Sequence, residues 1–375
     1  MDSKQYLDLN VAPRILLGPG PSMASPRVLR AMATPLVGHL DPQFLALMSE
    51  VQELLRYLFQ TENELTIPVS GTGSAGMEAA LCNFIEPGDR VLVAVMGYFG
   101  ERMVDMAGRY GAKVERLDRP WGQVFDPAEI EAELDGKNYK LLALVHAETS
   151  TGACQPGIAE IAAAAHRNGT LLVLDTVTSL GGLPVEIDAW DVDVAYSGTQ
   201  KCLSAPPGLA PLTVSPRARQ TLRSRSTPVA NWYLDLSLVE KYWGKERTYH
   251  HTAPITMNYA LREALRLAAE EGLETRFARH RSNAELLWEG LEALDLPLLV
   301  PYEHRLPTLS TPQIPPGVDD AAVRRRLLED YNIEIAGGFG PLKGQVWRIG
   351  LMGFSSRREN VTLLLAALEQ ILAQG

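Results

Sequence analysis

Short apolar runs alternate with segments of helical spacing between about residue 64 and about residue 215. Several runs are apolar at successive positions, which is typical of strands that are covered on both faces. The segments between them repeat apolar residues three and four positions apart, as a helix with one buried face does. This alternation predicts a mainly parallel sheet with right-handed crossovers. The predicted strands are residues 65–69, 90–95, 141–145, 171–174 and 192–196.

The pattern changes in the last third of the chain. The predicted elements there are a long helix at 259–292, a shorter helix at 323–331, a strand at 346–351 and a closing helix at 359–372. We therefore expect three parts: an N-terminal arm (1–20), a large domain (21–258) and a smaller C-terminal α+β domain (259–375).

Charge and cysteine content narrow the class of protein. The 375 residues carry a formal charge of −10, which argues against binding to nucleic acid or to anionic membranes. The three cysteines (Cys82, Cys154 and Cys202) form no CxxC pair, so the sequence gives no sign of a zinc or redox site. The chain starts without the apolar segment of a signal peptide, and it has no apolar run of about 18 residues that could span a membrane. We expect a cytoplasmic location.

Two polar residues stand at the ends of predicted strands. Asp175 directly follows the run at 171–174, and Lys201 comes shortly after the run at 192–196. The carboxyl ends of parallel strands meet at one edge of a sheet, and ligands bind there. A lysine that forms a Schiff base and an acid that protonates a pyridine nitrogen are the groups that pyridoxal phosphate requires. For each residue alone, the alternatives are an exposed surface lysine and a helix or turn cap.

The segment at 71–76 fits the GxGxxG pattern and lies between a predicted strand and a helix, which is the setting of a dinucleotide site. Such a site also requires an acid at the end of the next strand, and residues 95–97 contain none. The free N–H groups of a helix N-terminus, with the hydroxyls of Thr72 and Ser74, still make an anion site. We therefore expect a phosphomonoester at this turn.

Two further groups of residues invite a ligand. Arg348 lies inside a predicted strand, and its planar fork suits a substrate carboxylate; the alternative is an ion pair between domains. His250 and His251 invite a metal ion, but adjacent residues of a strand point to opposite faces, and no third ligand has suitable spacing. We expect no metal site.

A series of short segments covers nearly the whole chain: 17–22, 38–39, 70–73, 146–152, 175 with 179–182, 197–201, 205–208, 249–254, 334–338 and 348–351. In this order they resemble the class V, fold-type I aminotransferases, in particular the alanine–glyoxylate and serine–glyoxylate (serine–pyruvate) aminotransferases. The resemblance implies an α/β fold with a mainly parallel, seven-stranded-type sheet covered by helices, a smaller C-terminal domain, and pyridoxal 5'-phosphate as cofactor.

The same resemblance implies a set of cofactor-binding residues. Lys201 would be the Schiff-base lysine, and Asp175 would pair with the pyridine nitrogen. Thr149 would bond the ring hydroxyl, and Phe99 would stack on the ring, where relatives often carry tryptophan or tyrosine. Ser74 stands where some relatives have histidine. The residues that would line the phosphate end are Thr72, Gly73, Ser74 and Gln200.

The resemblance also implies a homodimer with shared active sites. Tyr249 and Thr252 would reach the phosphate that is bound by the other subunit. Arg348 would bind the α-carboxylate of the substrate. Gly20 and His39 would border the substrate side.

The reaction that the resemblance implies is ping-pong transamination from a small L-amino acid, alanine or serine, to glyoxylate or pyruvate. The (S)-ureidoglycine–glyoxylate and 2-aminoethylphosphonate–pyruvate aminotransferases share much of this motif set and stay alternatives, although the phosphonate has no α-carboxylate for Arg348. A class V lyase or desulfurase is a remote alternative, since a desulfurase needs a mobile cysteine late in the chain and none follows Cys202. A protein that binds the cofactor without turnover would lack Lys201 or Arg348, and both are present.

Overall fold

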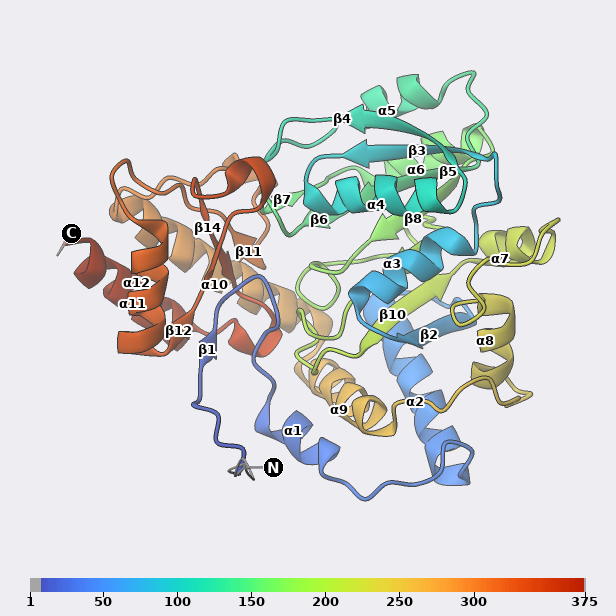
Figure 1. Ribbon diagram of the computed structural model, residues 1–375, viewed down its shortest axis with the longest axis horizontal. Helices are drawn as coiled ribbons and strands as arrows, with labels where there is room; N and C mark the ends of the chain where they lie inside the picture. The colour runs from blue at the N-terminus through green and yellow to red at the C-terminus, as the bar shows by residue number, and fades with distance from the viewer. Residues whose placement is uncertain (1–7, 374–375) are drawn as a thin grey trace, which may run out of the picture.

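The computed structural model describes residues 8–373, so residues 1–7 of the predicted N-terminal arm lie outside it (Figure 1). Its centre is a seven-stranded sheet in which β10 runs against its two neighbours and the other strands are parallel. The predicted mainly parallel, seven-stranded sheet is therefore confirmed. In order across the sheet, the strands are β2 (Leu65–Ser70), β10 (Leu209–Val214), β9 (Val194–Tyr196), β8 (Leu171–Asp175), β5 (Leu141–Val145), β3 (Arg90–Val95) and β4 (Lys113–Asp118).

Helices cover the sheet because most of them bury one apolar face against it, and α3 and α4 lie in front of the sheet in Figure 1. α1 packs instead on α9, where Val28 lies in a separate small cluster. Several helices begin at a side-chain cap; at α5, Asp126 and Glu129 form a reciprocal capping box. None of the helices within residues 8–373 is long and apolar enough to cross a membrane. The helices of this body are α1 (Pro26–Met32), α2 (Pro42–Phe59), α3 (Gly73–Cys82), α4 (Tyr98–Arg109), α5 (Pro127–Leu134), α6 (Ile158–Arg167), α7 (Pro216–Arg223) and α8 (Leu236–Trp243).

The single helix predicted at 259–292 is wrong, because the structure has two helices there. α9 (Ile255–Glu271) and α10 (Leu273–Ala293) meet at Gly272, whose φ of 79° and ψ of 141° interrupt the helical path. Leu265 of α9 belongs to the core around the large sheet, whereas Leu287 of α10 belongs to a second core. This packing favours Gly272 as the point of division, and the domain boundary at 258/259 stays a prediction.

The second core joins the two ends of the chain. β1 (Ile15–Leu16) pairs in parallel with β12 (Ile333–Glu334), and Leu17 is buried in the same core. Part of the predicted N-terminal arm therefore packs with C-terminal residues, on the left of Figure 1. The remaining elements are a small β6–β7 pair (Ala147–Glu148 with Ala153–Cys154), β11 (Leu309–Ser310), α11 (Asp320–Tyr331), β13 (Ala336–Gly337), β14 (Trp347–Gly350) and α12 (Arg358–Leu372).

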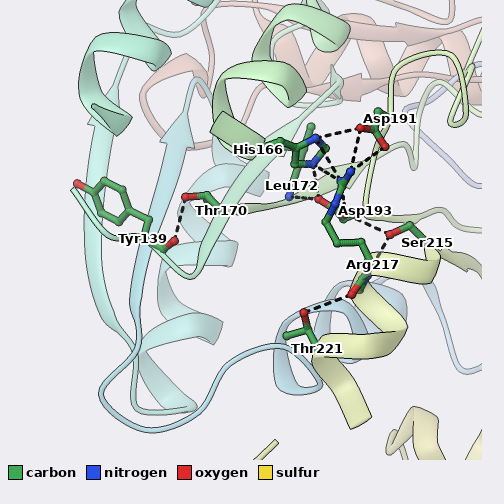
Figure 2. A network of polar contacts seen from close by, with 10 residues as sticks. Tyr139, His166, Thr170, Leu172, Asp191, Asp193, Ser215, Arg217 and Thr221 are labelled. Carbon is green, nitrogen blue, oxygen red and sulfur yellow. Dashed lines mark hydrogen bonds and ion pairs between the residues drawn. The ribbon is translucent and has the colours of Figure 1, made fainter. Parts of the chain in front are cut away.

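A buried polar network holds the amino ends of the central strands (Figure 2). The carboxylate of Asp193 is fully buried and accepts hydrogen bonds from His166 Nε2 (2.8 Å), the Leu172 backbone N–H (2.9 Å), Arg217 Nη1 (3.0 Å) and Ser215 Oγ (3.1 Å). A carboxylate out of water needs such partners. This network ties α6 and α7 to the sheet at the end opposite the carboxyl ends of the parallel strands.

Candidate active site

The carboxyl ends of the parallel strands bring most of the predicted site residues to one edge of the sheet. Asp175 is the last residue of β8, and the loop that carries Lys201 follows β9. Gly73 opens α3 after β2, and Phe99 lies in the first turn of α4 after β3. The parallel register therefore explains why residues far apart in the sequence meet here.

Lys201 is buried, and its Nζ donates a hydrogen bond to the backbone carbonyl of Pro19. Gly20 lies against the same side chain: a Cβ added to Gly20, whose φ is 109°, would come 2.8 Å from Lys201 Cδ. Only glycine permits this approach. Burial lowers the pKa of Lys201 to about 8, and the charges of Arg348 and Arg102 act in the same direction. A substantial fraction of the amine is therefore neutral near physiological pH.

Asp175 is 2% exposed, and it accepts hydrogen bonds from the Val177 backbone N–H (2.8 Å) and from the Tyr196 hydroxyl (2.7 Å). Burial raises its pKa to about 6, while these two hydrogen bonds and the charge of Lys201 oppose that rise. The carboxyl group is therefore mainly ionised at pH 7. Tyr196 was not among the predicted site residues, because an apolar strand residue gives no sign in the sequence of where its hydroxyl points.

The N-terminus of α3 faces the turn before Lys201. The Cα of Gly73 lies 3.4 Å from the position of a Cβ added to Gly198, so the two backbones are in contact. The side-chain oxygen of Gln200 is buried and has no hydrogen-bond partner among the described residues. Thr72 is the N-cap residue of α3 and makes no capping bond with its side chain. The N-terminus of α3 therefore has no side-chain cap, and its first backbone N–H groups are available to an anion.

A cation that the sequence analysis missed adds positive charge at this helix end. Arg102 Nη1 donates to Ser74 Oγ at 2.9 Å, and its guanidinium carbon lies 4.9 Å from the ring centroid of Phe99. The contact with Phe99 follows from helix geometry, because Arg102 stands one turn after Phe99 on α4, whereas the bond to Ser74 depends on the packing of α4 against α3. The spacing of three residues between Phe99 and Arg102 could have been recognised in the sequence. Arg102 therefore connects the predicted stacking residue with the predicted phosphate end.

Thr149 lies in the buried turn between β6 and β7, and its hydroxyl is hydrogen bonded to the hydroxyl of Thr178. Next to it, Glu148 is fully buried; its Oε1 accepts from the Ser150 hydroxyl at 2.6 Å, and its Oε2 has no partner among the described residues. Burial raises the pKa of Glu148 to about 7. The site thus holds a second buried carboxyl group, which the sequence analysis did not single out.

Arg348 enters the site from the smaller body, on β14. Its side chain is buried, and its Nε donates to the Gly337 carbonyl at 2.8 Å. Burial lowers its pKa to about 10, so the guanidinium stays charged at neutral pH. Its Nη groups have no hydrogen-bond partner within residues 8–373, which leaves the planar fork available to a carboxylate.

Three predicted residues lie on an exposed surface instead. Tyr249 is 58% exposed, and its ring centroid lies 5.2 Å from that of His39; Thr252 is also exposed. Within the chain, His39 therefore pairs with Tyr249 and not with Lys201. Their predicted roles at the cofactor and substrate stay predictions, which require a second subunit for Tyr249 and Thr252.

The expectation that His250 and His251 point to opposite faces is wrong. They do not belong to a strand, and their Nδ1 atoms lie 2.8 Å apart in a hydrogen bond. His251 also bonds Ser70 Oγ through Nε2 at 2.7 Å. In the part of the chain that the structure describes, no group of three or more histidine, cysteine, aspartate or glutamate side chains could hold a metal ion.

The fold and these residues agree with the comparisons to known proteins. The class V aminotransferase profile matches residues 16–359, and the chain belongs to this family. The (S)-ureidoglycine–glyoxylate transaminase of Bacillus subtilis (strain 168) is 44% identical over 96% of this chain and 90% of the relative. The alanine–glyoxylate aminotransferase of Drosophila melanogaster is 42% identical over 97% of this chain and 93% of the relative.

A solved structure is closer in sequence than these two relatives. The crystal structure of an alanine–glyoxylate aminotransferase from Nostoc sp. matches with a TM-score of 0.96 and 59% identity, over 98% of this chain and 97% of that one. The predicted family, fold type and enzyme class, an aminotransferase, are confirmed by these matches.

Proposed function

We propose that this aminotransferase uses pyridoxal 5'-phosphate to move the amino group of a small L-amino acid, alanine or serine, to glyoxylate or pyruvate. The observation that carries the proposal is the meeting of three buried charged groups. Lys201, Asp175 and Arg348 lie close enough for the charges of the other two to shift the pKa of Lys201. A nucleophilic amine, an acid and a carboxylate clamp are the set that this reaction needs.

The residues present fit the cofactor. Among the described residues, Asp175 accepts hydrogen bonds from neutral groups alone, and a protonated ring nitrogen would supply the cation that its carboxylate lacks. The N-terminus of α3, with the positive charge of Arg102 beside it, suits a phosphate. Phe99 offers a ring face for stacking.

Bound pyridoxal phosphate supplies an electron sink for the α-carbon of the substrate. With the cofactor bound, the neutral amine of Lys201, whose pKa is about 8, would accept the proton from the α-carbon of the substrate. It would then give this proton to the carbon that is attached to the cofactor ring. Asp175, ionised at neutral pH, keeps a proton on the ring nitrogen. Arg348 holds the α-carboxylate and so fixes which bond to the α-carbon is broken. The same residues serve both half-reactions, so we expect ping-pong kinetics.

The proposal also specifies which compound donates the amino group. Relatives named for ureidoglycine and for alanine are 44% and 42% identical to this chain, so ureidoglycine is the second candidate. The Nostoc match, at 59% identity, favours alanine. The buried fork of Arg348 favours donors with an α-carboxylate over 2-aminoethylphosphonate, and the absence of cysteine after Cys202 counts against a desulfurase.

Spectra of the holoenzyme test the donor. We expect the visible band of the cofactor to disappear within seconds after alanine or serine is added and to return when glyoxylate is added, because each half-reaction is reversible. Ureidoglycine and 2-aminoethylphosphonate are the comparison donors. A holoenzyme whose band responds to ureidoglycine alone would support the second candidate, and one that responds to no amino acid would contradict the proposal.

The assembly that we propose is a homodimer with shared sites. Trp232 (62% exposed) and Tyr233 (43%) lie near Tyr249 through ring contacts with the adjacent histidines, so aromatic side chains gather on this face. Such a face marks an interaction surface, and a second copy that covers it would bring Tyr249 and Thr252 to its phosphate.

Sedimentation velocity tests this assembly. We expect a species of twice the chain mass, and we expect Trp232→Glu to shift it toward the monomer and to weaken cofactor binding. Tyr302→Glu is the control, because Tyr302 is a 54% exposed aromatic residue on the smaller body. A fully active monomer would contradict the proposal. A cytoplasmic location stays a prediction from the cysteine content and from the lack of a signal-peptide or membrane-spanning pattern in the sequence.

A further inference from the structure

The guanidinium of Arg348 is held from two sides. Its Nε bonds the Gly337 carbonyl at 2.8 Å, and its central carbon lies 3.8 Å from the ring centroid of Phe339. At that distance the cation lies on the ring face, where the attraction is strongest. The backbone carbonyl fixes the position of Nε and the ring fixes the plane of the fork, so the remaining nitrogens point in a set direction.

Phe339 itself has little freedom to move. It follows β13 and precedes a short turn in which the Leu342 N–H bonds the Phe339 carbonyl at 2.8 Å. A Cβ added to Gly338 would come 2.1 Å from the Leu342 carbonyl oxygen, so the turn is closed tightly at this point. This turn fixes the backbone at Phe339, and the contact with the Arg348 guanidinium holds one face of its ring.

The ring of Phe339 also reaches the large body. Its centroid lies 5.0 Å from that of Tyr98, the first residue of α4, at an interplanar angle of 40°. Tyr98 in turn contacts Phe99, with centroids 5.7 Å apart, and its ring lies 5.3 Å from the Arg102 guanidinium carbon. Tyr98 and Phe339 are 38% and 37% exposed, so this aromatic pair faces solvent on one side and the site on the other.

On this geometry, and on the basis of the function proposed above, we propose that Phe339 is a positioning and specificity-determining residue. Its ring orients Arg348 for the α-carboxylate. With Tyr98 it forms a wall across the two bodies, which restricts the donor to an amino acid with a short side chain. Neither role was visible in the sequence, where Phe339 follows two glycines in a loop.

Two variants separate the two roles. Phe339→Leu keeps bulk but removes the ring face, so we expect the KM for alanine to rise about threefold to tenfold, with kcat within about twofold. Phe339→Ala removes both, and we expect the same loss together with a relative gain for phenylalanine: the ratio of its kcat/KM to that of alanine should rise at least about tenfold. The visible spectrum of the holoenzyme should not change in either variant.

Phe354→Leu is the matched control. Its ring packs against a different arginine, with the Arg357 guanidinium carbon 4.0 Å from the ring centroid. We expect the KM for alanine and the donor ratio to stay at wild-type values in this variant. A merely structural role of Phe339 would lower thermal stability in Phe339→Leu and Phe339→Ala and would leave the donor ratio unchanged.

A binding measurement keeps the inference separate from the proposed reaction. Calorimetric titration of the holoenzyme with glyoxylate requires no turnover, and we expect about threefold to tenfold weaker binding in Phe339→Leu. Equal affinity in wild type and Phe339→Leu, or an unchanged donor ratio in Phe339→Ala, would overturn the inference. A wild-type enzyme that binds glyoxylate but transfers no amino group would overturn the proposed function instead, while the calorimetry would still decide the role of Phe339.

Discussion

Replacement of Lys201 by alanine is expected to lower kcat for amino transfer by a factor on the order of 10⁴ or more, as removal of a residue that acts directly in the chemistry does. The reason is the environment of its amine. The side chain is buried, its pKa is lowered to about 8, and it lies beside the charged groups Asp175 and Arg348. No other lysine in the sequence stands at the carboxyl end of a central strand, so no second lysine is placed to take over this role. Stopped-flow measurement of each half-reaction gives the rates directly.

The variant should fold as well as wild type. A buried amine with a lowered pKa costs the folded state free energy when it is protonated, so its removal does not weaken the core. Lys343→Ala is the control, because Lys343 is exposed in the turn before β14, and its activity should equal that of wild type. A Lys201→Ala enzyme that keeps more than about a tenth of the activity would contradict the assignment of Lys201 as the proton-transferring base.

Five of the seven strands of the large sheet could be predicted, because they are apolar at most positions. β10 was not among the predicted strands, and neither was β4, which mixes charged and apolar residues. β3, β5 and β8 bury almost all of their side chains on both faces, and a run of that kind has few alternatives in a chain with helical segments between the runs. Asp175 and Lys201 were singled out for the same reason: a polar group at the end of a buried strand or shortly after it marks the ligand edge of a parallel sheet.

Long-range pairing could not be predicted. β10 is apolar like its neighbours, and nothing in its composition says that it runs against β9 and β2. The pairing of β1 with β12 joins residues more than 300 positions apart and depends on two-residue strands. The helical pattern after residue 259 continues through Gly272, since the sequence shows a tolerated glycine and the structure shows the φ that ends the helix.

The side-chain contacts that orient the charged groups of the site could not be predicted from the sequence either. Tyr196 bonds Asp175, and Phe339 stacks on Arg348, through hydroxyl and ring directions that the tertiary fold sets. Arg102 is the exception, because its helical spacing from Phe99 could have been used. Tyr249 and Thr252 were singled out from the resemblance alone, and a single chain gives them no contact with Lys201 that could test their role.

Asp175→Asn is expected to separate activity from stability. Asparagine can still accept from the Val177 N–H, but it cannot balance a protonated ring nitrogen, so we expect kcat to fall by a factor on the order of 10³. The cofactor-free protein should be stabilised at the same time. Burial raises the pKa of Asp175 from its ordinary 3.8 to about 6, so its carboxylate costs the folded state up to about 3 kcal/mol at pH 7.

The raised pKa of Asp175 makes the stability difference between Asp175→Asn and wild type depend on pH. The folded protein binds a proton at Asp175 more tightly than the unfolded chain does, so the favourable contribution is present below about pH 4 and is lost as the pH rises through about 6. The gain in the free energy of unfolding of Asp175→Asn over wild type should therefore be near zero at pH 4 and reach its full value by about pH 7. Urea unfolding of the two cofactor-free proteins at several pH values measures it.

Asp193→Asn is the matched control, because Asp193 is equally buried but differently paired. Its carboxylate contacts the guanidinium of Arg217 and the ring of His166 (Figure 2), and asparagine would leave the arginine without its buried partner. Because Arg217 is 45% exposed and keeps its ion pair with Asp191, we expect this variant to lose about 1 to 2 kcal/mol of stability at pH 7 and to keep its kcat. The two substitutions should thus change stability in opposite directions, and only Asp175→Asn should lower kcat. If Asp175→Asn also destabilised the cofactor-free protein at pH 7, its carboxylate would serve the fold, as that of Asp193 does, and its place in the reaction would have to be given up.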